Sequence, residues 1–273
     1  MPPQRTKATS SARPYPKADP PPGDRPMRVL ILGGSGYLGP HVVAELEADH
    51  EIVLTDVVPI ESDHETHQVD VADLGQVRAA ACNTDVIINC SVSRTHRRRA
   101  FDVNTLGTGN ALTAAVELGH ERFVNTGPRF TLAGPAYLRT DFALHEEIPP
   151  HPGTGLYAVS KSLGQELCRI FSEGYPIHVI TMIVSSFIDA EPPPGWRGEM
   201  NPFAVTYADA ARAIRCALEV DPARLPSRCE AFFLTVDLPQ QQCLSGKAQR
   251  LLGWAPQDKL ERWWQVGASP MNG

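Results

Sequence analysis

A glycine-rich turn between a short apolar stretch and a helical pattern constrains the fold of this chain more than any other feature. The stretch MRVLILGG, which begins at Met27, has the length and apolar character of a buried strand. The turn GGSGYLG follows it and opens a segment with helical spacing of apolar residues. Glycines permit such a turn and let the backbone approach a pyrophosphate at the helix N-terminus. We therefore predict a dinucleotide site with contacts from Gly33, Gly36, Tyr37, Leu38 and Gly39.

Apolar runs alternate with helical patterns along most of the chain. Beyond the first strand, strands are predicted at 51–56, 67–73, 84–92, 122–127 and 177–186. Helices are predicted at 36–49, 74–82, 104–119 and 157–174. Strands that alternate with helices in this way form a parallel sheet covered on both faces. The predicted fold is therefore α/β, a Rossmann-type doubly wound parallel sheet.

A carboxylate at the end of the second predicted strand indicates which dinucleotide binds. Asp56 follows Gly39 by 17 residues and can accept hydrogen bonds from the ribose hydroxyls of adenosine. It would repel a 2′-phosphate, and no Arg or Lys follows it in DVVPIES. The alternative is a strand-end Asp that only caps a turn. With the glycines upstream, the pattern favours NAD over NADP.

The pattern changes after residue 190, and this change sets the expected domain organisation. Residues 27–190 are expected to form the NAD-binding Rossmann domain, and 191–273 a small C-terminal substrate-binding region interleaved with it. Residues 1–26 contain eight prolines and almost no large apolar side chains, so we expect a disordered tail. Trp196, in a proline-rich loop, is interpreted as a packing residue rather than as part of a lid.

Composition excludes several classes of function. A formal net charge of −6 does not suit a nucleic-acid-binding protein, and no apolar run is long enough for a membrane span. The six cysteines form no C-x-x-C pair and lie near no histidine cluster, so neither a metal site nor a disulfide framework is expected. Reduced thiols favour a cytoplasmic protein.

Several segments in order resemble the extended short-chain dehydrogenase/reductases of the NAD-dependent epimerase/dehydratase type. They are GGSGYLG, LTD, VDVAD, DVIINCSV, NTLGTGNAL, YAVSK and LLGWAP, and they span residues 27 to about 260. The resemblance implies that Asp70 and Val71 flank the adenine, and that Cys90, Ser91 and Val92 line the cofactor beyond the fourth strand. It also implies that Asn104 orients the site and that Tyr157 and Lys161 are the catalytic pair.

The segment YAVSK places Tyr157 four residues before Lys161, so both side chains lie on one face of a helix. A free phenol has a pKa near 10, and we expect the nearby Lys161 ammonium and the cationic nicotinamide ring each to lower it. Tyr157 can then exchange a proton with a substrate hydroxyl, while Lys161 holds the nicotinamide ribose. On its own the segment could equally be an amphipathic helix with an incidental tyrosine and lysine. The surrounding motifs favour the catalytic interpretation.

One residue of the family pattern is missing. The family usually has a serine or threonine beyond the fifth strand, and here that position falls at Pro128 or Arg129. Thr126 and Thr131 are candidate replacements, and Arg129 could supply a charged donor instead. Loss of one oriented donor costs about 2.7–4 kcal/mol of transition-state stabilisation. A catalytically weakened NAD-binding protein with a regulatory or scaffolding role is therefore the alternative to an enzyme.

The substrate class is only partly indicated. The short C-terminal region and its LLGWAPQD ending are similar to those of uronate dehydrogenases, so a sugar, sugar acid or nucleotide sugar is expected as the small-molecule substrate. The run that begins at Arg97 could meet an acidic substrate or be a solvated surface. The sequence does not separate a dehydrogenase from an epimerase or a dehydratase. Apolar residues beyond one stripe on the helices from Asn104 and Tyr157 predict a homodimer.

Overall fold

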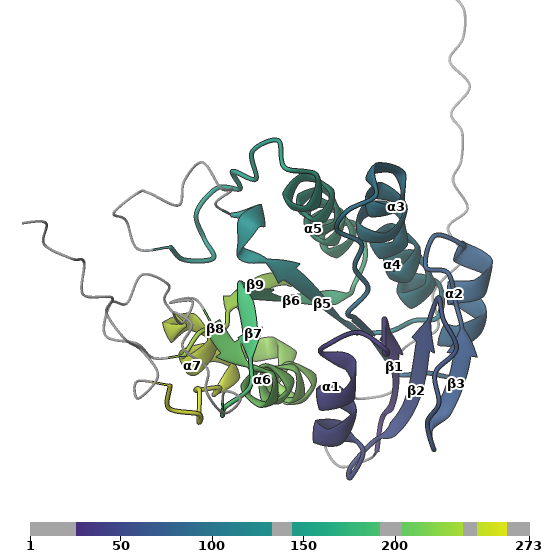
Figure 1. Ribbon diagram of the computed structural model, residues 1–273, viewed down its shortest axis with the longest axis horizontal. Helices are drawn as coiled ribbons and strands as arrows, with labels where there is room; N and C mark the ends of the chain where they lie inside the picture. Colours follow the sequence, from purple (N-terminus) through teal and green to yellow (C-terminus); the bar gives the residue numbers. More distant parts are fainter. Residues whose placement is uncertain (1–25, 133–143, 192–203, 237–244, 261–273) are drawn as a thin grey trace, which may run out of the picture.

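A parallel sheet forms the centre of the protein, as the alternation of strands and helices predicts. The computed structural model describes residues 26–132, 144–191, 204–236 and 245–260. Its seven parallel strands have the order β3-β2-β1-β4-β5-β6-β9 (Figure 1). They are β1 (Arg28–Leu32), β2 (Glu51–Asp56), β3 (Glu65–Gln68), β4 (Val86–Asn89), β5 (Arg122–Pro128), β6 (His178–Val184) and β9 (Cys229–Phe233).

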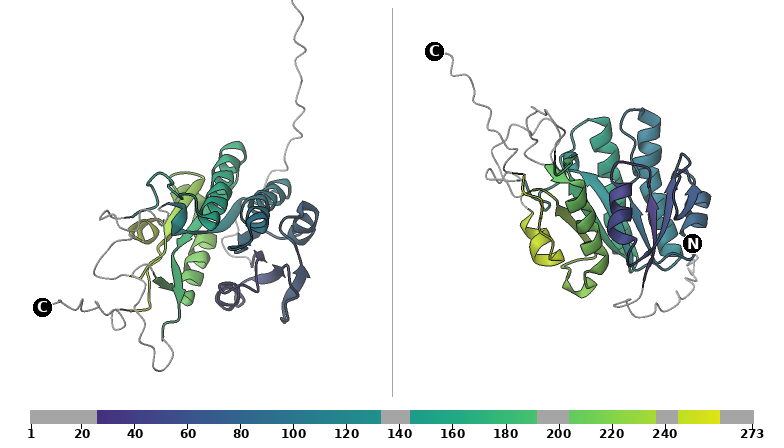
Figure 2. Two further views of the ribbon diagram at one scale, coloured as in Figure 1. Left: turned by 45° about the horizontal axis from the view of Figure 1, so that its top comes forward. Right: turned by 60° about the horizontal axis from the view of Figure 1, so that its bottom comes forward.

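Helices cover both faces of the sheet. On one face lie α1 (Gly39–Leu46) and α6 (Tyr207–Glu219); on the other lie α2 (Leu74–Ala81), α4 (Thr108–Glu117) and α5 (Leu156–Gly174) (Figures 1 and 2). The remaining elements are α3 (Arg97–Phe101), a π-helix η1 (Asp102–Gly107), the short helices η2 (Arg129–Thr131) and η4 (Pro222–Arg224), α7 (Gly246–Leu252) and the parallel pair β7 (Ser186–Ile188) and β8 (Ala204–Thr206). The predicted fold class is confirmed.

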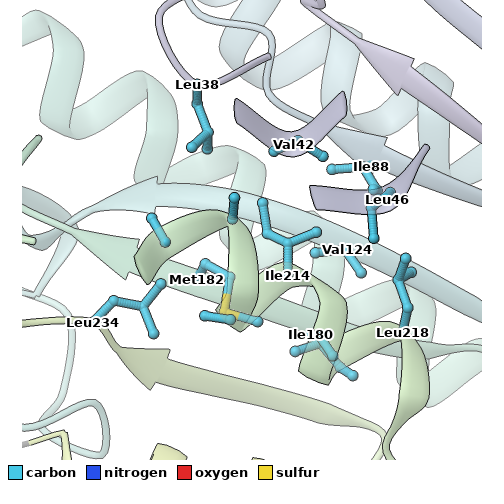
Figure 3. Close-up of a cluster of buried hydrophobic side chains, with 14 of the residues drawn as sticks. Leu38, Val42, Leu46, Ile88, Val124, Ile180, Met182, Ile214, Leu218 and Leu234 are labelled. Atoms are coloured by element: carbon cyan, nitrogen blue, oxygen red, sulfur yellow. The ribbon is translucent and has the colours of Figure 1, made fainter. Parts of the chain in front are cut away.

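Two apolar layers hold these elements together. Between the sheet and the pair α1 and α6, Val42 and Leu46 meet Ile214 and Leu218 over sheet residues such as Val124 (Figure 3). The opposite layer buries the inner faces of α2, α4 and α5 against the other side of the same strands. Burial of this kind contributes roughly 1.5–3 kcal/mol for each large side chain. Both faces of the sheet are therefore buried, as parallel strands require.

The order of the strands reverses between β1 and β4, and both strands pair with each other in parallel. In open α/β sheets, ligands bind outside the carboxyl ends of the strands at such a reversal. The glycine turn follows β1 at this point, and the loop that leads to Asn104 follows β4. The topology thus brings the two predicted halves of the site to one edge.

The structure changes three local predictions. The third strand covers Glu65–Gln68 rather than 67–73, because Val69 and Val71 turn to pack in the layer below the sheet. The long helix predicted from residue 104 begins as a π-helix. Within the predicted C-terminal region, β9 pairs with β6 in the main sheet, and α6 packs beside α1. The predicted tail and Trp196 lie outside the described residues, apart from Pro26. None of the described helices has the length and apolarity needed to span a membrane.

A glycine on α5 allows this helix to approach η1 closely. A Cβ atom on Gly164 would overlap the backbone oxygen of Asn104, whereas a Cβ on Gly174 of the same helix would meet nothing within 4 Å. Overpacking costs about 1–3 kcal/mol. We expect Gly164→Ala to lower the free energy of unfolding by about this amount in denaturant titrations.

The matched control is Gly174→Ala. This substitution places the same methyl group on the same helix in open space, so we expect it to raise the free energy of unfolding by up to about 1 kcal/mol, the propensity gain of alanine over glycine. Equal effects of the two substitutions would contradict the close packing of α5 on η1.

Candidate active site

The glycine turn is packed too tightly for side chains. Gly33 has a φ of +80°, and a Cβ there would lie 2.8 Å from the backbone of Ser91 at the end of β4. A Cβ on Gly39 would overlap the backbone of Gly34. Within the described residues, the amides of Tyr37 and Leu38 donate to no acceptor. Free amides at the start of α1 and a turn without side chains fit a diphosphate group.

Asp56 lies at the carboxyl end of β2, beside the turn. Its carboxylate accepts hydrogen bonds from the amide and the hydroxyl of Ser35, at 3.2 and 2.6 Å, and from the amide of Val57 at 2.7 Å. These donors fix the carboxylate next to the glycine turn. This position fits the predicted contact with the adenosine ribose.

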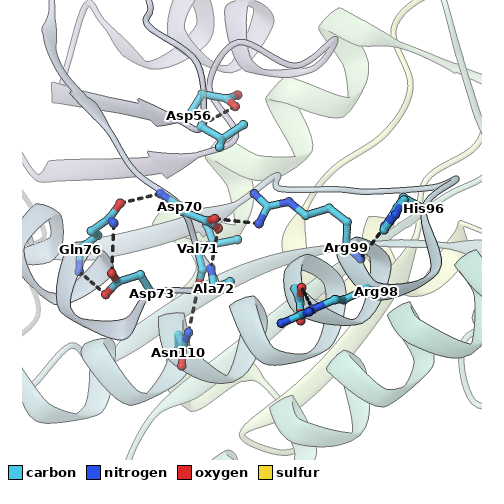
Figure 4. Close-up of polar contacts among 12 residues, drawn as sticks. Asp56, Asp70, Val71, Ala72, Asp73, Gln76, His96, Arg98, Arg99 and Asn110 are labelled. Atoms are coloured by element: carbon cyan, nitrogen blue, oxygen red, sulfur yellow. Dashed lines mark hydrogen bonds and ion pairs between the residues drawn. The ribbon is translucent and has the colours of Figure 1, made fainter.

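Asp70 has a partner that the sequence did not indicate. The guanidinium of Arg99 lies 2.7 Å from the Asp70 carboxylate, and this hydrogen bond lowers the pKa of Asp70 (Figure 4). The carbonyl of the neighbouring Val71 accepts a hydrogen bond of 2.9 Å from Asn110. The run of three arginines is therefore divided: Arg99 turns to Asp70, while the exposed Arg98 lies 3.7 Å from Asp102. Arg97 begins α3 with an exposed side chain.

Asn104 connects the loop after β4 with α5. Its Oδ1 accepts from the amide of Ser93 at 3.0 Å, and its Nδ2 donates to the carbonyl of Ser93 at 2.7 Å and to the hydroxyl of Ser160 at 2.9 Å. The side chain is fully buried and lies in the π-helix η1. Such π-helical turns are frequent at functional sites. Asn104 thus holds the residues next to Arg94 and Lys161.

Lys161 is a buried cation held by carbonyl oxygens. Its Nζ donates to the carbonyls of Ser91 and Thr126, at 2.9 and 3.2 Å. Burial lowers the pKa of Lys161 to about 8, and the charge of Arg94 adds to this effect, while Cys90 and Cys168 oppose it. The two carbonyls lie just beyond the ends of β4 and within β5. The lysine therefore reaches the carboxyl edge of the sheet from α5.

Arg94 supplies positive charge next to Tyr157. Burial raises the pKa of its phenol, whereas the charge of Arg94 and a hydrogen bond from its guanidinium lower it. The guanidinium carbon of Arg94 lies 5.4 Å from the centre of the Tyr157 ring. We expected Lys161 to lower this pKa, but here Arg94 supplies the positive charge. The only sequence signal was an arginine in the loop after the fourth strand.

The candidate replacements for the missing serine are held by other groups. The hydroxyl of Thr126 donates to the carbonyl of Asn89 at 2.9 Å. Arg129 is buried, and its Nε donates to the hydroxyl of Ser185 at 2.7 Å while its guanidinium lies over the ring of Phe130. Arg129 is thus tied to the end of β6. A role in catalysis for Thr126, or in substrate binding for Arg129, stays a prediction.

The residues beyond β4 are placed at the same edge. Ser91 is buried, and its hydroxyl donates to Asn89 at 2.6 Å. Cys90 packs against the apolar layer of α1 and α6, and burial raises the pKa of its thiol to about 12. Val92 is exposed. This arrangement leaves Val92 free to face a bound molecule, and Cys90 is a neutral packing group.

The fold and the tyrosine–lysine helix together define a short-chain dehydrogenase/reductase. The sequence profile of the NAD dependent epimerase/dehydratase family matches residues 29–201, and the chain belongs to this family. NAD is the cofactor of the family, which confirms the cofactor predicted from the sequence.

Several known proteins of similar sequence or structure are sugar or sugar-acid dehydrogenases by name. The 3-beta-hydroxysteroid dehydrogenase of Mycolicibacterium neoaurum is also similar, 31% identical over 122 residues, which cover 39% of this chain and 33% of that protein. The NAD-dependent glucose-6-phosphate dehydrogenase of Haloferax volcanii is 24% identical over 253 residues, which cover 84% of this chain and 93% of that protein. Uronate dehydrogenase from Agrobacterium tumefaciens superposes with a TM-score of 0.74 at 22% identity, covering 87% of this chain and 86% of that one. A mutant of that enzyme has been solved in complex with NAD. Glucuronic acid dehydrogenase from Chromohalobacter salexigens gives a TM-score of 0.73 at 24% identity, with coverage of 87% and 86%.

The position of Asp56 leads to a prediction on cofactor choice. We expect NAD to bind at least about tenfold more tightly than NADP, a difference of about 1.4 kcal/mol, because Asp56 repels a 2′-phosphate. Asp56→Asn should narrow this difference. The exposed Asp63 lies on the loop after β2, and Asp63→Asn should leave the difference unchanged. Titration calorimetry with both dinucleotides measures these affinities, and equal affinities in the wild type would show that Asp56 does not select the cofactor.

Proposed function

We propose that this protein is an NAD-dependent oxidoreductase or epimerase that acts on a hydroxyl group of a sugar, sugar acid or nucleotide sugar. The observation that carries the proposal is the position of Lys161 and Tyr157. They lie one turn apart on α5, and Lys161 reaches the carbonyls of Ser91 and Thr126 at the carboxyl edge of the sheet. The sugar enzymes of similar sequence and fold support the substrate class.

In this proposal Tyr157 is the acid/base. It takes the proton of the substrate hydroxyl during oxidation and returns it in the reverse direction. Bound NAD accepts or supplies the hydride. Burial keeps the phenol of Tyr157 protonated near neutral pH, so nearby positive charge has to stabilise its deprotonated form. Arg94 supplies this charge from the loop after β4, and Lys161 orients the nicotinamide ribose.

A catalytically weakened NAD-binding protein with a regulatory or scaffolding role is the second candidate. The hydrogen bonds of Thr126 to Asn89 and of Arg129 to Ser185 favour it, because both side chains are committed to the protein. Incubation with NAD and a panel of sugars and uronates, followed by the absorbance of reduced cofactor, separates the two candidates. Reduction of NAD, or conversion of a sugar to its epimer as followed by NMR, supports the enzyme. NAD binding with neither reaction supports the second candidate.

Two substitutions test the roles on α5. Tyr157→Phe removes the transferable proton and keeps the ring, so turnover should fall by about 10²–10⁴ while NAD affinity changes little. Lys161→Ala should weaken NAD binding as well as slow turnover, because it removes a contact to the cofactor. Steady-state kinetics and NAD titrations of each variant make the comparison. Wild-type turnover in Tyr157→Phe would show that Tyr157 is not the acid/base.

We also propose that the protein is a cytoplasmic homodimer. Apolar side chains remain exposed on the outer surface of η1 and α5, with exposed fractions of 49% for Leu106, 45% for Leu163 and 47% for Ile170. A twofold mate would cover them in a four-helix interface. Light scattering at micromolar concentration should give the mass of a dimer, and Leu163→Glu should shift it towards the monomer. A monomeric mass of the wild type would contradict this assembly. Val58→Glu, in the loop after β2 at a residue that is 49% exposed, provides a matched control.

A further inference from the structure

We propose that Arg94 binds an anionic group of the substrate, a carboxylate or a phosphate, beside the hydroxyl that reacts. This inference rests on the proposed function and narrows its substrate class to acidic sugars. Arg94 was not among the residues that the sequence motifs indicated. Three observations support this role for Arg94: the backbone next to it is fixed, its side chain contacts Tyr157, and no described carboxylate forms an ion pair with it.

The backbone next to Arg94 is fixed by Asn104. Both the amide and the carbonyl of Ser93 are hydrogen-bonded to the Asn104 side chain, at 3.0 and 2.7 Å. A few residues later, His96 accepts from the amide of Arg99 at 3.3 Å, which begins α3. The short loop that carries Arg94 is therefore held at both ends. A long side chain on such a loop is directed to one region rather than spread over the surface.

That region is the reacting centre. The guanidinium carbon of Arg94 lies 5.4 Å from the centre of the Tyr157 ring, and the charge of Arg94 lowers the pKa of this phenol. Burial raises the pKa of a second phenol, Tyr207, and the charge of Arg94 lowers it. The ring of Tyr207 is stacked between His41 and Phe187, with ring centres 4.6 and 5.1 Å apart. Arg94 thus lies near two phenols, one of them the proposed acid/base.

The charge of Arg94 has no counter-ion in the part of the chain that the structure describes. No carboxylate there lies within ion-pair distance of its guanidinium. Asp189 is the carboxylate that acts on Tyr207 together with Arg94, but it forms no ion pair with Arg94. Seven other arginines do pair with carboxylates: Arg28, Arg78, Arg98, Arg99, Arg169, Arg212 and Arg215. Arg97 and Arg224 also form no ion pair among the described residues, so what distinguishes the exposed Arg94 is its place against the Tyr157 ring. An anionic ligand bound there would supply its counter-ion.

The chemistry of the guanidinium suits this role. Arginine has five N–H donors in a planar fork, so Arg94 can stay in contact with the Tyr157 ring and still present two parallel donors to a carboxylate or phosphate. The anionic group would then lie within a few bonds of the hydroxyl that Tyr157 deprotonates. Partial burial of the phenol strengthens such charge-assisted contacts. The competing interpretation is that Arg94 serves only the ionisation of Tyr157.

Three hexoses that share one ring separate these possibilities: glucose, glucuronate and glucose 6-phosphate. Their binding is measured by titration calorimetry on the full chain saturated with NADH, which prevents oxidation of the sugar. We expect at least one acid to bind the wild type about tenfold or more tightly than glucose, because charge-assisted bidentate contacts are the strong ones. Tighter binding of glucuronate indicates a carboxylate, and tighter binding of glucose 6-phosphate indicates a phosphate.

The variants are Arg94→Gln and its matched control Arg98→Gln. Both remove one positive charge from neighbouring positions, but Arg98 is exposed and faces Asp102. Arg94→Gln should reduce the preference for the acid to about twofold or less, whereas Arg98→Gln should keep it. Unchanged NADH affinity in both variants shows that the fold is intact.

Several outcomes would overturn the proposal. The wild type could bind the acids no more tightly than glucose, or bind neither acid. The preference for an acid over glucose could survive in Arg94→Gln, or fall equally in Arg94→Gln and Arg98→Gln. If Arg94→Gln keeps the preference for an acid over glucose but raises the apparent pKa of turnover, Arg94 acts only on the ionisation of Tyr157. The proposed function is tested separately with NAD. Binding of an acid through Arg94 with neither reduction of NAD nor epimerisation of the sugar contradicts the proposed function. Oxidation of glucose as fast as the acids contradicts only the role of Arg94.

Discussion

The buried amide of Asn104 is the interaction on which the rest of the candidate site depends. Through three hydrogen bonds it joins Ser93, in the loop after β4, to Ser160 on α5. Arg94 follows the first of these serines, and Lys161 follows the second. Because an unpaired buried amide costs about 1–3 kcal/mol for each lost partner, the two segments hold a fixed relation. Gly164 permits this contact, since α5 could not lie so close to η1 with a side chain there.

The sequence predicts the framework because the framework follows from local patterns. Apolar runs ended by glycine or polar residues located β1, β2, β4, β5 and β6, and the turn with Gly33 located the reversal of strand order. The predicted bounds of the third strand were wrong by a few residues, because Val69 packs in the apolar layer under α2, α4 and α5 rather than pairing within the sheet. The place of β9 beside β6 was missed because it depends on a contact between segments far apart in the chain. No local pattern contains that information.

Some residues of the candidate site could likewise be predicted from local patterns, whereas others depend on contacts between distant segments. Tyr157, Lys161 and Asn104 come from motifs with fixed spacing, and the structure brings them to one edge of the sheet. Arg94 belongs to a loop without periodicity, and its contact with Tyr157 joins two distant segments. The neighbouring run of three arginines was the more conspicuous signal, yet Arg99 pairs with Asp70 and Arg98 faces Asp102. Charge alone did not indicate which arginine lies against Tyr157; the structure shows that it is Arg94.

The electrostatics of the site connect cofactor, substrate and the missing serine. Lys161 is buried with only carbonyl oxygens as partners, and Arg94 has no carboxylate partner among the described residues. A buried cation without a counter-ion, here Lys161, raises the free energy of the ligand-free protein, whereas the exposed Arg94 is solvated. Ligands that bind beside Lys161 therefore stabilise the protein. A serine hydroxyl is a neutral donor and supports neutral and acidic substrates equally. In the proposal that Arg94 acts beside Tyr157, the same guanidinium that favours the phenolate also favours a negatively charged substrate. The missing serine and the proposed selection of an acid would then have one physical cause.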